Sequence, residues 1–313
     1  MNILSNVKKL PGGLMLVPMV IGAVIHTFIP DIVEIGNPMT AIFSKQGTMT
    51  VVGIILIFAG IDTNFKSIRK CVKKSGFLIV LKLVLNIVCS LFIIRVLGEG
   101  GIYGISSLAL VACICSCNAG LYLALMKQYG DEGDLAGFAL LNVTGLPFIP
   151  VAVLGYAGGN GIDLNSIAAT ILPFIIGIIL GSIDQEIKKF TRPGMEIMLP
   201  FLGFCLGSSI DLKIAFQSVG TGIILFIIFT LLNNLPLVLV EKLLLKSSGY
   251  VSMGISSVAG LALTVPALLL QSDSSYAVYM ERALSQIAMA VVLSAVITPV
   301  LVKWRWKNKF IRR

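Results

Sequence analysis

The sequence of 313 residues is poor in charged side chains, because Asp, Glu, Lys and Arg together make up only 12% of it. A soluble domain usually carries about 25% of these residues. Hydrophobic residues make up 57% of the chain, and the mean hydropathy is +0.97. This composition excludes an ordinary soluble enzyme, a disordered chain and a nucleic-acid-binding protein. It indicates a polytopic membrane protein that is surrounded by the lipid bilayer.

The motifs of several enzyme and motor classes are also missing. There is no Walker A pattern, so no ATP-driven motor is visible. The single histidine, His26, leaves no His-Glu-x-x-His zinc site, and no Gly-x-Ser-x-Gly nucleophile motif occurs. We therefore expect a transport protein rather than an enzyme, with no cofactor.

Apolar sequence is abundant, in runs that approach the roughly 20 residues that a membrane-spanning helix needs. Ten such runs occur, at residues 12–29, 47–62, 76–97, 102–127, 135–156, 166–183, 196–210, 219–242, 250–271 and 283–303. They predict an all-α polytopic membrane protein with ten transmembrane helices, which we number as spans 1 to 10 in chain order.

The basic residues predict the orientation of these spans. With the N-terminus placed in the cytoplasm, nineteen Lys and Arg residues fall in cytoplasmic segments, four fall in outer segments, and Lys82 falls inside span 3. Loops on the cytoplasmic side of membrane proteins carry an excess of Lys and Arg. The pattern therefore predicts that both termini are cytoplasmic.

The two halves of the chain, residues 1–158 and 159–313, share an order of motifs. For example, Asn-Ala-Gly-Leu at residues 118–121 in span 4 matches Val-Ala-Gly-Leu at residues 258–261 in span 9. Each half holds five spans, which is an odd number, so two halves in series must have opposite orientations in the membrane. This organisation is an inverted repeat, which is frequent among secondary transporters.

Small and polar residues crowd the centres of spans 4 and 9, at residues 112–120 and 254–266. Such residues let neighbouring helices pack closely, and they also accompany breaks in a helix. A break inside the bilayer is tolerated only where it lines a cavity, and the symmetric pair favours breaks in both spans. A half-helix that begins at a break presents free N–H groups and a positive dipole end, which suit an anionic substrate.

Polar residues of these two segments are the candidates for substrate binding at the crossing of the spans: Ser116, Asn118, Ser256, Ser257 and Thr264. Asn118 is the most informative, because an amide in mid-membrane is costly unless it is hydrogen-bonded. It caps the break, touches the ligand, or does both.

Lys82 is the one fixed charge expected in the middle of a span. A lysine inside the membrane is expensive and usually functional. It can bind a substrate carboxylate or carry the coupled proton, or its stem can extend to the cytoplasmic surface. Asn86 lies one turn further along the same helix face, so it is a second candidate for substrate binding.

Uncharged oxygens in the second half of each repeat offer a further candidate site. Asn142 and Thr144 of span 5 are suited to a sugar acid. Together with Gln286 of span 10 they are also a possible cation site.

Three segments carry a resemblance to a known family: residues 9–18 (KLPGGLMLVP), residues 118–122 (NAGLY) and residues 210–212 (IDL). Together with Lys82 they resemble the 2-keto-3-deoxygluconate permeases, and the similarity extends over nearly the whole chain. The resemblance implies a fold similar to that of the bile-acid sodium symporters. In that fold spans 3–5 and 8–10 form a core, in which spans 4 and 9 are broken and cross, and spans 1, 2, 6 and 7 form a panel.

The resemblance also implies an activity, the import of the sugar-acid anion 2-keto-3-deoxygluconate with protons across the bacterial inner membrane. The chain lacks the acidic residues that enterobacterial members carry near the positions of Cys115 and Thr144. Proton coupling is therefore expected to fall to Lys82. The alternative is a sodium-coupled organic-anion symporter of the bile-acid transporter type.

Overall fold

The structure is a computed structural model that describes residues 2–9, 13–44, 46–63, 75–157, 164–271 and 273–311. Within these residues every regular element is a helix, and the only extended pairing is an isolated bridge between Ile102 and Ile105. The all-α prediction is therefore confirmed for this part of the chain. Several basic residues that were counted for the orientation lie outside it: Lys45, Lys66, Arg69, Lys70, Lys73, Lys74, Arg312 and Arg313.

Five apolar helical segments of the described chain are long enough to cross a bilayer. They are α6 (Ser75–Leu97), α7 and α8 (Ser107–Ile114, Ala119–Tyr129), α15, η2 and α16 (Val219–Phe229, Thr230–Asn234, Leu235–Leu243), α17, η3 and α18 (Tyr250–Ile255, Gly260–Thr264, Val265–Leu269), and η4 and α19 (Ser274–Tyr279, Met280–Ile311). A sixth is formed if α9 (Glu132–Thr144) and α10 (Phe148–Ala157), which meet at a bend of 47°, are one span.

Four further apolar helices occupy the remaining predicted runs: α2 (Gly13–Phe28), α4 (Gly47–Asp62), α11 (Leu164–Ile183) and α13 (Gly194–Gly207). Helices α2 and α4 have 16 residues each and are therefore about 24 Å long, and α13 has 14. Helix α11 has 20 residues, of which Ile171–Ile183 form its short apolar stretch. The hydrocarbon core of a bilayer is about 30 Å thick. By length and composition, the described residues thus hold five or six helical segments that can cross a membrane and four apolar stretches that are shorter.

These four helices pack in two pairs, with glycine residues where the two helices of a pair touch. A Cβ atom at Gly207 of α13 would collide with the carbonyl oxygen of Met19 in α2. Likewise, a Cβ atom at Gly177 of α11 would collide with the carbonyl oxygen of Ile57 in α4. Each glycine belongs to a Gly-x-x-x-Gly motif, which lets membrane helices approach until their backbones touch. We call α2, α4, α11 and α13 the glycine-packed group.

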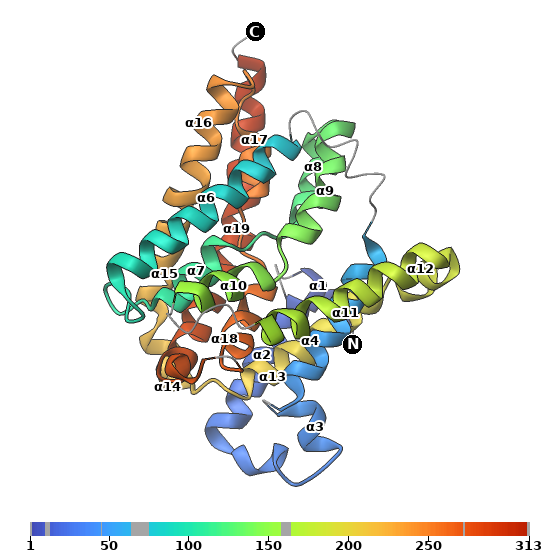
Figure 1. The fold of residues 1–313 in the computed structure, drawn as a ribbon, viewed down its shortest axis with the longest axis vertical. Helices are drawn as coiled ribbons and strands as arrows, with labels where there is room; N and C mark the ends of the chain where they lie inside the picture. Colours follow the sequence, from blue (N-terminus) through green and yellow to red (C-terminus); the bar gives the residue numbers. More distant parts are fainter. Residues whose placement is uncertain are drawn as a thin grey trace.

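Figure 1 shows the glycine-packed group in the lower and right part of the molecule, with the short helices α1 (Ile3–Lys9), α3 (Met39–Phe43) and α12 (Gln185–Thr191) beside it. The larger group, which contains α6 to α9 and α15 to α19, fills the upper and left part. Within it α15 and α17 pack on α19, and α6 and α8 pack on α9. Helix α10 contacts both groups, through α11 on one side and α6 and α18 on the other.

The structure interrupts a helix at each of the two places where the sequence predicts a break. Helix α7 ends at Ile114 and α8 begins at Ala119, while α17 ends at Ile255 and the 3-10 helix η3 begins at Gly260. Residues 115–118 and 256–259 therefore form two non-helical linkers, and both are almost entirely buried.

Two predicted boundaries were wrong. The run at 102–127 was expected to be helical from its start, but α7 begins at Ser107. Gly98, Gly101, Tyr103 and Gly104 have positive φ angles, which turn the backbone and prevent a helix there. At the other end of the chain, α19 runs from Met280 to Ile311 and is longer than the run at 283–303.

Candidate functional site

The two linkers are joined by a reciprocal pair of hydrogen bonds. The backbone N–H of Ala259 donates to Ser116 Oγ over 2.8 Å, and the backbone N–H of Asn118 donates to Ser257 Oγ over 3.1 Å. Each linker thus supplies a serine that satisfies a backbone donor of the other. Such partners are necessary, because an unpaired N–H group inside a membrane protein costs several kcal/mol.

Asn118 begins the second half of the first interrupted helix. It is the N-cap of α8, and its Oδ1 accepts a hydrogen bond from the N–H of Leu121 over 3.0 Å. An asparagine at this position satisfies one of the free N–H groups of the first turn. The capping role predicted for Asn118 is therefore present in the structure.

Lys82 lies behind the first linker. Its side chain is buried, with the residue 3% exposed, and its Nζ donates to the carbonyl oxygen of Ser116 over 2.6 Å. The side chain therefore does not extend to the cytoplasmic surface. Among the described residues it has no carboxylate within ion-pair distance. Asn86 and Ser90, further along the same face of α6, are buried as well.

The second linker is held to α19 and leaves one hydroxyl unpaired. The N–H of Val258 donates to Ser294 Oγ over 2.8 Å. Thr264 Oγ1 donates to the carbonyl oxygen of Leu261 in its own turn. Ser256 Oγ is buried and has no hydrogen-bond partner within the described part of the chain.

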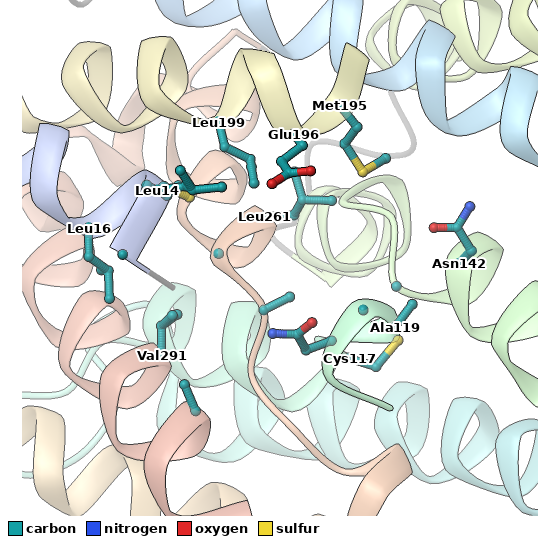
Figure 2. Close-up of a pocket in the computed structure, with 18 of the residues that line it drawn as sticks. Leu14, Leu16, Cys117, Ala119, Asn142, Met195, Glu196, Leu199, Leu261 and Val291 are labelled. Atoms are coloured by element: carbon teal, nitrogen blue, oxygen red, sulfur yellow. The ribbon is translucent and has the colours of Figure 1, made fainter. Parts of the chain in front are cut away.

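A cavity of about 450 Å³ lies where the two linkers face the glycine-packed group. Figure 2 shows Met195 and Glu196 of α13 along its upper side, Cys117 and Ala119 below, and Asn142 of α9 at the right. The described lining residues are Lys8, Gly13, Leu14, Met15, Leu16, Cys117, Asn118, Ala119, Gly120, Leu141, Asn142, Gly145, Met195, Glu196, Leu199, Ala259, Gly260, Leu261, Val291 and Ala295. The volume and the apolar wall with few polar groups are typical of a small-molecule site.

Of the predicted site residues, Asn118 and Asn142 line this cavity. The other predicted residues are outside the lining: Lys82, Asn86, Ser116, Thr144, Ser256, Ser257, Thr264 and Gln286. Among these, Ser116 and Ser257 hold the linkers together and Lys82 supports Ser116, so they build the cavity wall from behind.

The three residues of the possible cation site do not share a hydrogen-bond network in the described structure. Gln286 Nε2 donates to the carbonyl oxygen of Gly104 and to Thr221 Oγ1, each over 2.9 Å. Thr144 Oγ1 donates to the carbonyl oxygen of Leu140 within α9. Asn142 alone of the three reaches the cavity. No cluster of three or more His, Cys, Asp or Glu side chains suited to a metal occurs among the described residues.

Sequence reasoning missed the charged pair of the cavity. Lys8 Nζ lies 2.6 Å from Glu196 Oε1, and the two side chains are 48% and 52% exposed. Lys8 was interpreted only as an orientation signal, and Glu196 only as the first residue of the run at 196–210. The sequence offered one signal for Glu196, namely that it is a carboxylate at the start of an apolar run in a chain with only 15 acidic residues.

Comparison with known proteins gives a consistent result. The family model described as 2-keto-3-deoxygluconate permease matches residues 4–310. The chain is 34% identical over 309 residues to 2-keto-3-deoxygluconate permease 1 of Salmonella typhimurium, which covers 99% of this chain and 97% of that protein. It is 30% identical over 315 residues to the 2-keto-3-deoxygluconate permease of Escherichia coli, which covers 99% of this chain and 96% of that protein.

Proposed function

Because the chain belongs to the 2-keto-3-deoxygluconate permease family, we propose that it is a secondary active transporter, not an enzyme, that imports 2-keto-3-deoxygluconate or a similar small sugar-acid anion with protons. The observation that carries this proposal is the cavity between the two linkers and the glycine-packed group. Its volume suits one small sugar acid. Interrupted helices at such a cavity are typical of secondary transporters.

The proposed architecture has ten spans in two inverted repeats, residues 1–158 and 159–313. Two features support it. Ser116 and Asn118 of one linker pair with Ala259 and Ser257 of the other at the same spacing of two residues. In the glycine-packed group, α2 pairs with α13 and α4 pairs with α11, which is the exchange of partners that a two-fold axis would produce.

The transport cycle that we propose moves the larger group, as the core, against the glycine-packed group, as the panel. The cavity lies at the contact between them, so an elevator-like movement would carry a bound substrate from one side to the other. We propose that both termini lie in the cytoplasm and that the protein lies in the bacterial inner membrane, which the basic-residue pattern and the bacterial relatives support.

The residues are proposed to divide into three sets. Asn118 and Asn142 contact the substrate, and the N-terminus of α8 faces the cavity through Ala119 and Gly120, where free N–H groups attract an anion. Lys82 carries the coupled proton. The remaining candidates shape the crossing from behind: Asn86, Ser116, Thr144, Ser256, Ser257 and Thr264.

The function is tested by uptake of labelled 2-keto-3-deoxygluconate into proteoliposomes, with a pH gradient and a sodium gradient imposed separately. We expect accumulation above the equilibrium level with an inward proton gradient alone. Accumulation with sodium alone would replace the proton by sodium and favour the symporter alternative. No uptake of this substrate by folded protein under either gradient would contradict the proposed substrate.

Asn142→Ala is expected to weaken substrate affinity by about tenfold, because a lost hydrogen bond to a charged or polar ligand is worth about 1.5 kcal/mol. The matched control is Thr144→Val on the same helix, since that hydroxyl bonds Leu140 and lies outside the cavity lining. The KM for uptake distinguishes them. An equal change in KM for both variants would show that Asn142 has no special role.

A further inference from the structure

Within the proposed function, we infer that Lys8 binds the carboxylate of the substrate, and that Glu196 is an internal carboxylate that holds Lys8 while the cavity is empty. The proposal deepens the proposed function, since it names the cation that recognises the acid group of the substrate. It rests on the position and the pairing of these two side chains.

Two of the residues that line the cavity carry a charge. Of its described lining residues, Lys8 and Glu196 are the charged ones. A sugar acid carries a full negative charge, and a helix N-terminus offers only about half an elementary charge in return. A full cation is therefore needed beside the acid group, and Lys8 is the one that the described lining provides.

Lys82 is the other candidate for this role, on the basis of the sequence. Its Nζ donates to the carbonyl oxygen of Ser116 behind the linker, and the residue does not line the cavity. A carboxylate in the cavity would meet the linker before it met this amine. Lys8, by contrast, reaches the cavity from α1, and nearly half of its side chain is exposed.

Glu196 supplies a carboxylate beside Lys8. Glu196 Oε1 lies 2.6 Å from Lys8 Nζ, which is the geometry that a substrate carboxylate would adopt. An unpaired Glu196 in the same cavity would repel an anion. When Glu196 is paired with Lys8, the cavity has no net charge. The Glu196 side chain is half-exposed, so water can solvate its carboxylate when the substrate binds Lys8 instead. Substrate and Glu196 therefore compete for one cation.

The experiment measures the binding of 2-keto-3-deoxygluconate to the purified full-length protein by isothermal titration calorimetry. Lys8→Gln should weaken binding by about tenfold. Glu196→Gln should tighten it by about fivefold, because exposed ion pairs of this kind are worth up to about a factor of five in an equilibrium constant. A gain in affinity cannot come from a misfolded variant.

The decisive comparison is made without Glu196. If Lys8 contacts the substrate, the double variant Lys8→Gln/Glu196→Gln should bind about tenfold more weakly than Glu196→Gln alone. If Lys8 only anchors Glu196, the two should bind equally, and that result would overturn the proposal. The uncharged amide of the substrate should bind the wild type and Lys8→Gln with equal affinity, and a difference there would also overturn it.

A matched ion pair outside the cavity serves as control. Lys189 Nζ lies 2.7 Å from Glu186 Oε1 on α12, and neither residue lines the cavity. Lys189→Gln and Glu186→Gln should leave the affinity for substrate unchanged. If they change it as much as the variants at Lys8 and Glu196 do, the effect on affinity comes from general surface charge, and the proposal is overturned. Failure of the wild type to bind 2-keto-3-deoxygluconate would overturn the proposed function and this inference together. Normal wild-type binding with an unaffected Lys8→Gln variant would overturn this inference alone.

Discussion

The Lys82→Met variant is expected to lose proton-driven accumulation of substrate, with an initial uptake rate about one to two orders of magnitude below that of the wild type. Methionine keeps the apolar stem but removes the donor to the carbonyl oxygen of Ser116. A buried acceptor left without a partner costs about 1–3 kcal/mol, and each 1.4 kcal/mol corresponds to about a factor of ten. The destabilised linker also holds Ser116 Oγ, to which the N–H of Ala259 donates.

Two uptake assays separate the two roles of Lys82. Exchange of labelled for unlabelled substrate across the membrane needs no net proton movement, whereas accumulation against a gradient does. If Lys82 carries the proton, Lys82→Met should retain measurable exchange while accumulation disappears. Loss of both in a protein of normal melting temperature would mean that the lysine acts only by holding the linker.

The control for Lys82 is Lys188→Met. Lys188 Nζ also donates to a backbone carbonyl oxygen, that of Asp62, over 2.9 Å, but it does so at the exposed end of α4. This variant should transport normally. Normal accumulation in Lys82→Met as well would remove Lys82 from the mechanism.

The Gly207→Ala variant is expected to lower the melting temperature of the protein by several degrees. The added Cβ atom would collide with the carbonyl oxygen of Met19, so α2 would have to move away from α13. Overpacking of this kind costs about 1–3 kcal/mol. Because α2 and α13 both line the cavity, substrate binding should weaken in the same variant.

Gly53→Ala is the matched control for Gly207. Gly53 also lies within an apolar helix of the glycine-packed group, but a Cβ atom there would meet no heavy atom within 4 Å. Alanine favours a helix more than glycine does, so the melting temperature should stay the same or rise slightly. Fluorescence-detected size-exclusion chromatography after heating measures both variants. A Gly207→Ala protein as stable as Gly53→Ala would contradict direct backbone packing of α2 on α13.

Local pattern was enough to identify the class of this protein and to locate most of its helices. Apolar runs are continuous in the sequence, so α4 was predicted at residues 47–62 with the bounds that the structure has. The small residues at 112–120 and 254–266 predicted where α7 and α17 end, because the signal for a break is also local. Asn118 was identified for the same reason, since an N-cap bonds a backbone group only three residues away.

The start of α7 shows the limit of that approach. Residues 102–106 carry no charge and include Ile102 and Ile105, so hydropathy joins them to the helix that follows, but glycines at positions 98, 101 and 104 turn the backbone through positive φ angles. Hydropathy does not record backbone conformation, so the run was predicted to be helical too early.

The site depended on contacts that no local pattern records. Sequence alone determined that this is a helical membrane protein of a permease family, and it predicted one helix break in each half of the chain. Only the tertiary structure decided that Lys82 donates to the carbonyl oxygen of Ser116 behind a linker, and that Lys8 forms an ion pair with Glu196 at the cavity. In the sequence, a charged residue near the end of an apolar run indicates only the orientation of a span, because its contacts are not visible there. Its chemical role is set by the partner that folding brings to it, and here that partner is 188 positions away in the chain.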